Sequence, residues 1–233
     1  MNELRKDLND RGGRRTAFLL LCAFLLCYGG GLSAQQNRDF EPYCFAGAGL
    51  GPRVYFGDHN RQMDVGDRFS FGGDLFAGRQ WSPVIGARLG YSLQSISGVT
   101  QNGSFSTGTV YDASQWLDKQ EYNVGHLYAD LLVDAVTLLW GYEPQRFYTL
   151  IPFTGVGWAH TMTAPTSSGK PLHSASLSIG LLNKFRLNET LDLTLDARGA
   201  LVSDKFDNEP GNRKGEGILS INVGIVYKLK VKR

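Results

Sequence analysis

The sequence predicts an all-β protein, a transmembrane up-and-down antiparallel β-barrel of eight strands. Apolar and polar residues alternate with period two over most of the chain, one side of each segment is apolar while the other holds charges and glycine, and short connections alternate with long ones. The stretch TLDLTLDARGALVS, from Thr190 to Ser203, is an example, because its leucines alternate with Asp192, Asp196 and other polar residues.

Eight segments show this period and are long enough to be strands. They span residues 43–56, 69–80, 84–98, 122–137, 147–161, 172–187, 190–203 and 216–229. Three connections are short: WSP, LLWGYEPQR, and the pair Asn188 and Glu189. The other four are longer, polar and rich in turn-forming residues: GDHNRQMDVGDR, VTQNGSFSTGTVYDASQWLDKQE, MTAPTSSGKP and DKFDNEPGNRKG. This asymmetry is typical of a membrane barrel with periplasmic turns and extracellular loops, and an even strand number leaves both termini periplasmic.

Three features favour lipid over water around the apolar sides. The segments reach the roughly 9–11 residues that a tilted strand needs to cross a bilayer. Glycine occurs on the polar sides, as Gly86, Gly90, Gly180 and Gly224. Glycine weakens a strand, but it leaves room for large polar side chains inside a narrow barrel. Aromatic residues favour the two membrane interfaces; near the segment ends they are Phe56, Phe69, Trp81, Tyr122, Trp140, Tyr142, Tyr148, Trp158 and Tyr227. The alternative is a soluble sandwich or lipocalin-like barrel with its apolar side inward.

Three segments depart from the pattern. Pro52 and Pro152 lie inside the first and fifth segments, where each removes a backbone donor from the hydrogen-bond ladder. In the second segment Phe76 shares a side with Asp74, and we expect a β-bulge to account for it.

Residues 1–34 resemble a secretory signal peptide, and residues 35–233 form the predicted barrel domain. RGGRR supplies a positive region, Thr16–Tyr28 an apolar one, and GGGLSA small residues before a cleavage site between Ala34 and Gln35. An uncleaved membrane anchor is the alternative. Cleavage leaves Cys44 as the one cysteine, so neither an intrachain disulfide nor a thiolate metal site is expected.

Charge is balanced, which argues against a nucleic-acid-binding role. The chain has 24 basic and 22 acidic residues, and residues 1–34 contain five and three of them, which leaves 19 of each sign in the predicted mature protein.

The run HLYADLLVDAVTLLWGYEPQRFYTLIPFTGVGW resembles the barrel domain of OmpA-like outer membrane proteins of Gram-negative bacteria. NKFRLNETLDLTLDARGALVSDKFDN, followed by GILSINVGIVYKL, resembles it as well. The resemblance implies an eight-stranded barrel, a signal peptide and assembly by the outer membrane insertion machinery. We expect it to concern the barrel domain alone, without the peptidoglycan-binding domain that some members of the family carry.

The polar sides carry matching numbers of cations and anions. They are Arg88, Lys184, Arg186, Arg198 and Lys228 against Asp74, Asp130, Asp134, Asp192 and Asp196. A selective pore is expected to show an excess of one sign. The balance therefore predicts a barrel-interior ion network that seals the lumen.

Other chemistry is weakly indicated. His126, Asp130 and Asp134 lie on one side of a segment, and with a serine from Ser174–Ser178 they could imitate a hydrolase site. We interpret this histidine as a hydrogen-bond partner instead. His160 and His173 flank a long loop without a carboxylate in register, which is a poor metal signal. We therefore predict no enzyme activity, no catalytic residue, no cofactor and no metal.

The expected role is structural, in the cell outer membrane, with four loops displayed at the surface. Expected partners are outer membrane lipids and, during biogenesis, the insertion machinery, but no nucleic acid. Two alternatives stay open. The loops, chiefly Val99–Glu121 with Trp116, could bind surface ligands or other outer membrane proteins, or the barrel could be a narrow pore.

Overall fold

The computed structural model describes residues 40–57, 60–165, 169–203, 206 and 215–229. The predicted signal peptide and the cleavage site between Ala34 and Gln35 lie outside these residues. The strands are β1 (Tyr43–Phe56), β2 (Phe69–Gln80), β3 (Ile85–Thr100), β4 (Ser106–Asp112), β5 (Leu117–Val133), β6 (Tyr148–Thr161), β7 (His173–Arg186), β8 (Leu191–Val202) and β9 (Glu216–Leu229). The described helices are the 3₁₀ turns η1 (Asn60–Gln62) and η2 (Val65–Arg68) and the short α-helix α2 (Ala135–Trp140).

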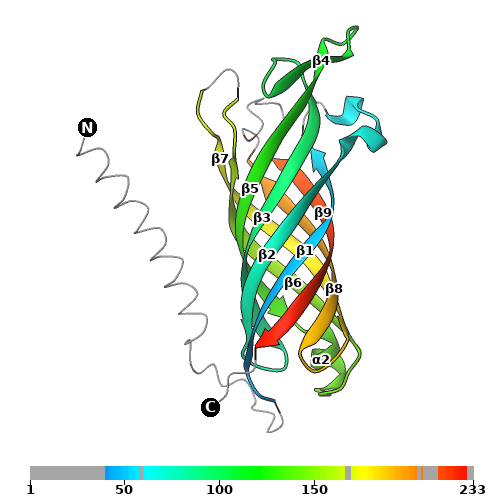
Figure 1. Cartoon of the computed structure of the whole chain (residues 1–233), viewed down its shortest axis with the longest axis vertical. Helices are drawn as coiled ribbons and strands as arrows, with labels where there is room; N and C mark the ends of the chain where they lie inside the picture. The colour runs from blue at the N-terminus through cyan, green and yellow to red at the C-terminus, as the bar shows by residue number, and fades with distance from the viewer. Residues whose placement is uncertain (1–39, 58–59, 166–168, 204–205, 207–214, 230–233) are drawn as a thin grey trace, which may run out of the picture. The chain divides into compact units, whose positions relative to one another are not determined.

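Within the described residues, eight antiparallel strands close into a barrel (Figure 1). Each strand pairs with its neighbour in the order β1, β2, β3, β5, β6, β7, β8 and β9, and β9 returns to β1. β4 stands outside this circle and pairs with β5. Closure leaves no sheet edge along the wall, which hydrocarbon surroundings require because they offer backbone groups no hydrogen-bond partners.

The predicted segments match the barrel strands to within a few residues at most ends, with one clear exception. The fourth segment, predicted as 122–137, is displaced: β5 begins at Leu117 and ends at Val133. Asp134 then caps α2, where its Oδ1 accepts a hydrogen bond of 2.7 Å from the backbone N–H of Thr137. The prediction that Asp134 is a strand residue is therefore wrong, because helix capping ends the strand at this aspartate. Its buried carboxylate still lies among the charged side chains at this end of the barrel, where it lines one cavity with Lys184 and Asp192.

The predicted loop 99–121 is largely regular structure. β3 and β5 continue their pairing as far as Thr100 and Asp118, and β4 adds a third strand beside them. These strands project from the barrel as a hairpin at one end (Figure 1). We call this the long-loop end; the opposite end, with α2 and the β2–β3 and β7–β8 turns, is the short-turn end.

Pro52, Pro152 and Phe76 were the residues expected to disturb the strand pairing. β2 pairs with β1 without a break from Gln80 to Phe69, so no bulge explains Phe76, and that prediction is wrong. Phe76 is instead a lumen residue. The β1–β9 ladder passes from Leu50 to Arg53 without a pair at Pro52, which has no N–H to donate. Pro152 stays in register, opposite Leu181.

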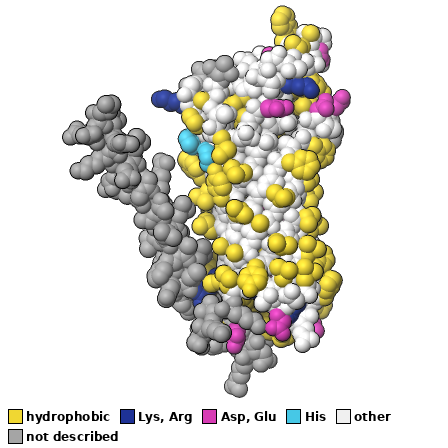
Figure 2. Space-filling model, in the orientation of Figure 1, with side chains coloured by type: hydrophobic (Ala, Val, Ile, Leu, Met, Phe, Trp, Pro, Cys, Tyr) yellow, Lys and Arg dark blue, Asp and Glu magenta, His cyan; other side chains and the backbone are white. Residues whose placement is uncertain are grey.

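The outer wall is apolar, as predicted for lipid contact. Figure 2 shows hydrophobic side chains along the height of the barrel and charged side chains gathered near its two ends. Exposed apolar residues of the wall include Leu50, Phe71, Leu75, Leu131, Val156, Leu177, Ile179, Leu201 and Val223. On β6 the exposed rings of Tyr148 and Trp158 lie ten positions apart, in agreement with the roughly 9–11 residues of a crossing strand. Within the described residues, no helix has both the length and the apolar character to cross a bilayer.

The lumen is filled by side chains, and glycine makes room for them. A Cβ on Gly90 would lie 2.4 Å from the ring of Tyr128, and one on Gly180 would lie 2.3 Å from the ring of Phe153. These two glycines therefore face crowded positions, as the sequence predicted.

Apolar clusters lie inside the barrel toward both ends. The cluster toward the short-turn end contains Phe45, Leu132, Ile151, Phe153, Leu182 and Val226. The cluster toward the long-loop end contains Tyr55, Ile96, Phe105, Tyr122, Val124, Ala159, Ala200, Val202, Phe206 and Ile218. Tyr122 was predicted at a membrane interface, but it is buried and stacks on Phe105 with ring centroids 4.2 Å apart. The prediction for this ring is wrong because period two alone does not distinguish an interfacial position from a lumen position near a strand end.

Candidate functional site

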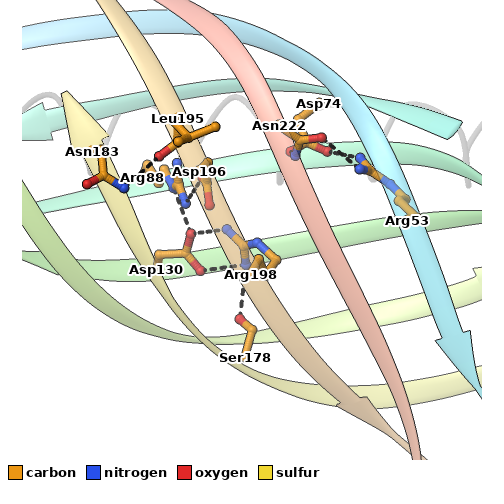
Figure 3. A network of polar contacts seen from close by, with 10 residues as sticks. All are labelled: Arg53, Asp74, Arg88, Asp130, Ser178, Asn183, Leu195, Asp196, Arg198 and Asn222. Carbon is orange, nitrogen blue, oxygen red and sulfur yellow. Dashed lines mark hydrogen bonds and ion pairs between the residues drawn. The ribbon is translucent and has the colours of Figure 1, made fainter. Parts of the chain in front are cut away.

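Four charged side chains meet at the centre of the lumen (Figure 3). Arg88 on β3 places Nε 2.7 Å from Oδ2 of Asp130 on β5 and Nη2 2.7 Å from Oδ2 of Asp196 on β8. Arg198, also on β8, contacts both oxygens of Asp130 at 3.0 and 2.5 Å and donates to Ser178 Oγ at 3.0 Å. Arg88 and Asp130 are almost wholly buried, with 1% and 2% of their surfaces exposed. We call these four charged residues the central cluster.

Aromatic rings pack against the guanidinium groups of the central cluster. The Arg88 guanidinium carbon lies 4.6 Å from the ring centroid of Phe153 and 5.2 Å from that of Phe76. The Arg198 carbon lies 4.0 Å from the ring centroid of Tyr128. A cation over a ring face is attracted by the ring quadrupole, and the attraction increases where water is excluded. This explains why Phe76 shares the inner side of β2 with Asp74.

A second charged cluster involves Arg53, which was not among the predicted interior charges. Arg53 donates to Asn222 Oδ1 at 2.7 Å, to Asp74 Oδ1 at 2.9 Å and to Ser92 Oγ at 3.2 Å. Asn222 in turn donates to the second oxygen of Asp74 at 2.6 Å. The signal for Arg53 was its two-residue spacing from Tyr55 on the inner side of β1, and Pro52 obscured it.

The remaining predicted cations lie together near the short-turn end. Lys228 Nζ is 2.8 Å from Asp192 Oδ1, and Lys184 Nζ is 3.9 Å from Asp192 Oδ2. Arg186 lies nearby on β7, where its Nε donates to the carbonyl of Asn188 at 3.3 Å. The predicted single network is thus divided into separate clusters along the lumen.

A small cavity adjoins the central cluster on its side toward the long-loop end. The cavity lined by Asp74, His126, Tyr128 and Arg198 measures about 10 Å³, which is close to the minimum volume that holds one water molecule. Buried charges of opposite sign are tolerated when they are paired and hydrogen-bonded, whereas an isolated one is costly. The geometry therefore forms an ionic plug inside the barrel.

Two of the residues considered for a hydrolase-like site, His126 and Ser176, are in contact. His126 Nε2 lies 2.7 Å from Ser176 Oγ, although the two residues are 50 positions apart. Asp130, however, binds Arg88 and Arg198, and the adjoining cavity is too small for a substrate. The contact therefore serves to satisfy two buried polar groups.

His160 and His173 do come together. They are direct partners across β6 and β7, and their ring centroids lie 6.1 Å apart in a stacked arrangement. His173 also stacks on Trp158, at 6.1 Å. Among the described residues, no three His, Cys, Asp or Glu side chains are grouped so that they could hold a metal ion.

Known proteins share both the sequence pattern and the fold. No family profile matches the chain. Outer membrane protein 41 of Porphyromonas gingivalis is 27% identical over 151 residues, which cover 64% of this chain and 35% of that protein. Outer membrane protein 40 of the same organism is 22% identical over 204 residues, which cover 84% and 50%. The chain thus spans half or less of the length of these relatives.

Among solved structures, Neisserial surface protein A superposes with a TM-score of 0.51 and 10% identity, over 82% of this chain and all of that one. At this identity the likeness concerns the fold alone. The outward apolar wall, the charged lumen, the outer membrane relatives and the shared barrel lead to one conclusion: the chain is an integral β-barrel of the outer membrane.

Proposed function

We propose that this protein is a structural barrel of the OmpA-like type, which contributes to the integrity of the cell envelope and does not conduct solutes. The observation that carries the proposal is the central cluster, in which Arg88 and Arg198 are balanced by Asp130 and Asp196 without an excess of either sign. Solutes crossing the barrel would have to displace these pairs and the apolar clusters at both ends. In the proposed orientation the long-loop end is extracellular and the short-turn end periplasmic, as in other outer membrane barrels.

Planar-bilayer recording tests the sealed lumen. We expect the purified wild-type barrel to give no stepwise conductance at either polarity, because the ion pairs and rings fill its cross-section. The matched variant replaces Arg88, Arg198, Asp130 and Asp196 together by serine, which removes the plug without leaving unpaired charge. Any conductance that this variant gains measures the part of the seal that the central cluster supplies, since the apolar clusters toward both ends remain. Regular conductance steps from the wild-type barrel would contradict the proposal.

A second function, binding through the loops, is favoured by Trp116. This residue lies at the tip of the β4–β5 hairpin, where 84% of its surface is exposed, and it has a positive φ of 57°. Exposed tryptophan is a frequent anchor of binding interfaces, and a left-handed conformation in a residue other than glycine costs energy. A strained, exposed ring on a projecting hairpin is difficult to explain by barrel stability.

Local hydrogen bonds hold the hairpin, and a segment held in this way loses less conformational entropy on binding. At its tip, Asp112 Oδ1 accepts hydrogen bonds from the hydroxyl of Ser114 at 2.7 Å and from its backbone N–H at 2.8 Å. The hydrogen bond from the Ser114 hydroxyl has the largest effect, and together the two bonds hold the pKa of Asp112 below its ordinary value. Next to the tip, Tyr111 Oη accepts a hydrogen bond of 2.9 Å from the backbone N–H of Asp64, which joins the hairpin to the first long loop.

Binding of labelled barrel to host cells and to an extract of outer membrane proteins tests this second function. We expect Trp116→Ala to reduce specific binding about tenfold or more, since loss of a central aromatic anchor typically costs about 2 kcal/mol or more. Val110→Ala, at an exposed position of β4, is the control and is expected to have a smaller effect. Equal binding by wild type, Trp116→Ala and a hairpin-deletion variant would exclude the hairpin as the binding element.

A further inference from the structure

The outer side of the barrel carries two neighbouring histidines near the long-loop end. His160 on β6 and His173 on β7 are direct partners in the ladder, and their ring centroids lie 6.1 Å apart. The side chain of His173 is exposed and that of His160 is partly exposed. Figure 2 shows histidine side chains on the outer surface, where the apolar wall meets the loops. We call these two residues the histidine pair.

The register places the histidine pair at the level of a membrane interface. Trp158 lies two positions before His160 on the outer side of β6, exposes 51% of its surface and stacks on His173 at 6.1 Å. On the barrel side of this ring the wall continues with the exposed apolar residues Val156 and Leu177. Tryptophan rings favour the headgroup region of a bilayer. The two imidazoles therefore lie at the height of the lipid headgroups, which in the proposed orientation belong to the outer leaflet.

A third strand contributes to the setting of the histidine pair. Tyr91 on β3 places Oη 3.4 Å from Nε2 of His160, although β5 lies between their strands. The residue of β5 that pairs with His160 is Gly125. A Cβ on Gly125 would collide with Tyr91 Oη and would lie 2.5 Å from Cε1 of His160. The missing side chain thus allows the phenol and the imidazole to meet on the outer surface.

The ring nitrogens of the histidine pair have few protein partners. Among the described residues, the contact with Tyr91 is the one hydrogen bond of the His160 ring, and the His173 ring makes ring contacts alone. In the same part of the chain, neither imidazole forms an ion pair with a carboxylate. A polar group at this level then depends on water or on a lipid headgroup for its hydrogen bonds.

The charges around the histidine pair favour an anion as the partner. Lys170 is exposed and precedes His173 by three positions. On the outer side of β5, the first carboxylate toward the long-loop end is Glu121, four positions from Gly125 and thus roughly 13 Å along the strand. This exceeds the Debye length of about 8 Å at physiological ionic strength, so salt screens most of its effect. The outer sides of β3, β6 and β7 carry no Asp, Glu, Lys or Arg within their described residues.

Protonation changes what the histidine pair can bind. A neutral imidazole has one N–H donor, whereas the protonated ring has two and carries a positive charge. Two neighbouring imidazolium groups repel each other, and an oxyanion between them offsets that repulsion. Hydrogen bonds from a charged donor to a phosphate are stronger than those between neutral groups. Lipid phosphates are oxyanions at the height where the register places the two rings.

We propose that the histidine pair binds the phosphate group of an outer-leaflet lipid, and that binding strengthens as the imidazoles take up protons below about pH 6.5. Tyr91 positions the His160 ring, and the acyl chains of the same lipid contact Trp158, Val156 and Leu177. The contact lies on the outside of the barrel, so it requires neither a sealed lumen nor binding by the hairpin.

Quenching of tryptophan fluorescence by brominated lipids tests the contact, because bromine quenches those rings that lie beside the lipid carrying it. The reporter is the full barrel in phosphatidylcholine nanodiscs with Trp158 as its one tryptophan, after replacement of Trp81, Trp116 and Trp140 by phenylalanine. The probe is phosphatidic acid brominated on its acyl chains. Brominated diacylglycerol, which has the same chains without the phosphate, is the control lipid.

We expect the enrichment of phosphatidic acid beside Trp158 to rise about fivefold from about pH 7.5 to about pH 5.5, as for one exposed charge-assisted hydrogen bond. A phosphate monoester loses negative charge over this interval, so the rise has to come from the protein. With His160→Gln and His173→Gln combined, the change should stay below about twofold. A second reporter that keeps Trp140 alone, at the short-turn end, should show no rise.

Three results would overturn the proposal: no rise beside Trp158, the same rise in the double glutamine variant, or equal enrichment of phosphatidic acid and diacylglycerol at about pH 5.5. Migration on a detergent gel before and after boiling confirms that the compared barrels are folded. If the double variant does not fold, His173→Gln alone replaces it, because this side chain is exposed, and it should lose at least half of the rise.

Discussion

Replacing Arg88 with alanine is expected to lower the free energy of unfolding by about 3–5 kcal/mol, the cost of removing one partner of a buried ion pair. Arg88 contacts Asp130 and Asp196 at 2.7 Å each, and its own surface is 1% exposed. Without it, Asp196 loses its ion pair with the central cluster, Phe76 loses the guanidinium that packs on its ring, and Phe153 keeps only that of Arg198. Arg198→Ala should act in the same direction, because Asp130 loses both of its contacts with that guanidinium.

Urea titration in lipid vesicles measures this effect, and migration on a detergent gel before and after boiling reports the folded fraction. Arg79→Ala is the matched control, since Arg79 lies on the neighbouring strand opposite Ala87 and its side chain is directed away from the lumen. It should change the stability by less than about 1 kcal/mol. The double variant Arg88→Met with Asp196→Leu should recover part of the loss, because paired removal leaves no isolated charge on Asp196. Wild-type stability in both Arg88→Ala and Arg198→Ala would refute the structural role of the central cluster.

Gly180→Ala is expected to destabilise the barrel by about 1–3 kcal/mol, the usual cost of overpacking a filled interior. A methyl group on Gly180 would lie 2.3 Å from the ring of Phe153 and 2.3 Å from the backbone oxygen of Ala197. The ring cannot withdraw freely, because the guanidinium groups of Arg88 and Arg198 pack on it at 4.6 and 4.7 Å. The backbone oxygen belongs to the ladder with β8 and is equally constrained.

Gly199→Ala provides the comparison on the adjacent strand. Its nearest neighbour would be the backbone oxygen of Ile179 at 3.9 Å, which is ordinary van der Waals contact. The same urea titration should therefore leave Gly199→Ala at wild-type stability or slightly above it, since alanine loses less conformational entropy than glycine. Similar stabilities for the two alanine variants would show that the space beside Phe153 is not limiting.

The sequence by itself determined the strands and their two sides. Period two is a local property, because successive side chains of a strand point to opposite faces whatever the strand pairs with. It correctly placed Arg88, Asp130, Asp196 and Arg198 inside and the leucines of β8 outside. The lengths of the connections likewise indicated which ends of the strands lie together.

Predictions from the period-two pattern were wrong or incomplete at positions where another interaction was stronger. Asp134 became a helix cap, since its carboxylate satisfies the N–H of Thr137. Phe76 did not mark a bulge, because its ring packs beneath the guanidinium of Arg88. Arg53 was missed beside Pro52, although it binds Asp74 and Asn222.

Only the tertiary structure decided which charges meet. Arg88 and Asp130 are 42 positions apart but are direct partners in the β3–β5 ladder, the pairing that completes the barrel. Arg198 and Asp130 are 68 positions apart and lie on strands that are not neighbours. Such contacts depend on the register and curvature of the closed sheet, which bring opposite walls within reach of long side chains. Spacing along one strand cannot encode a distance across the lumen, so the division of the charges into the central cluster and a second group around Asp192 near the short-turn end follows from closure of the barrel.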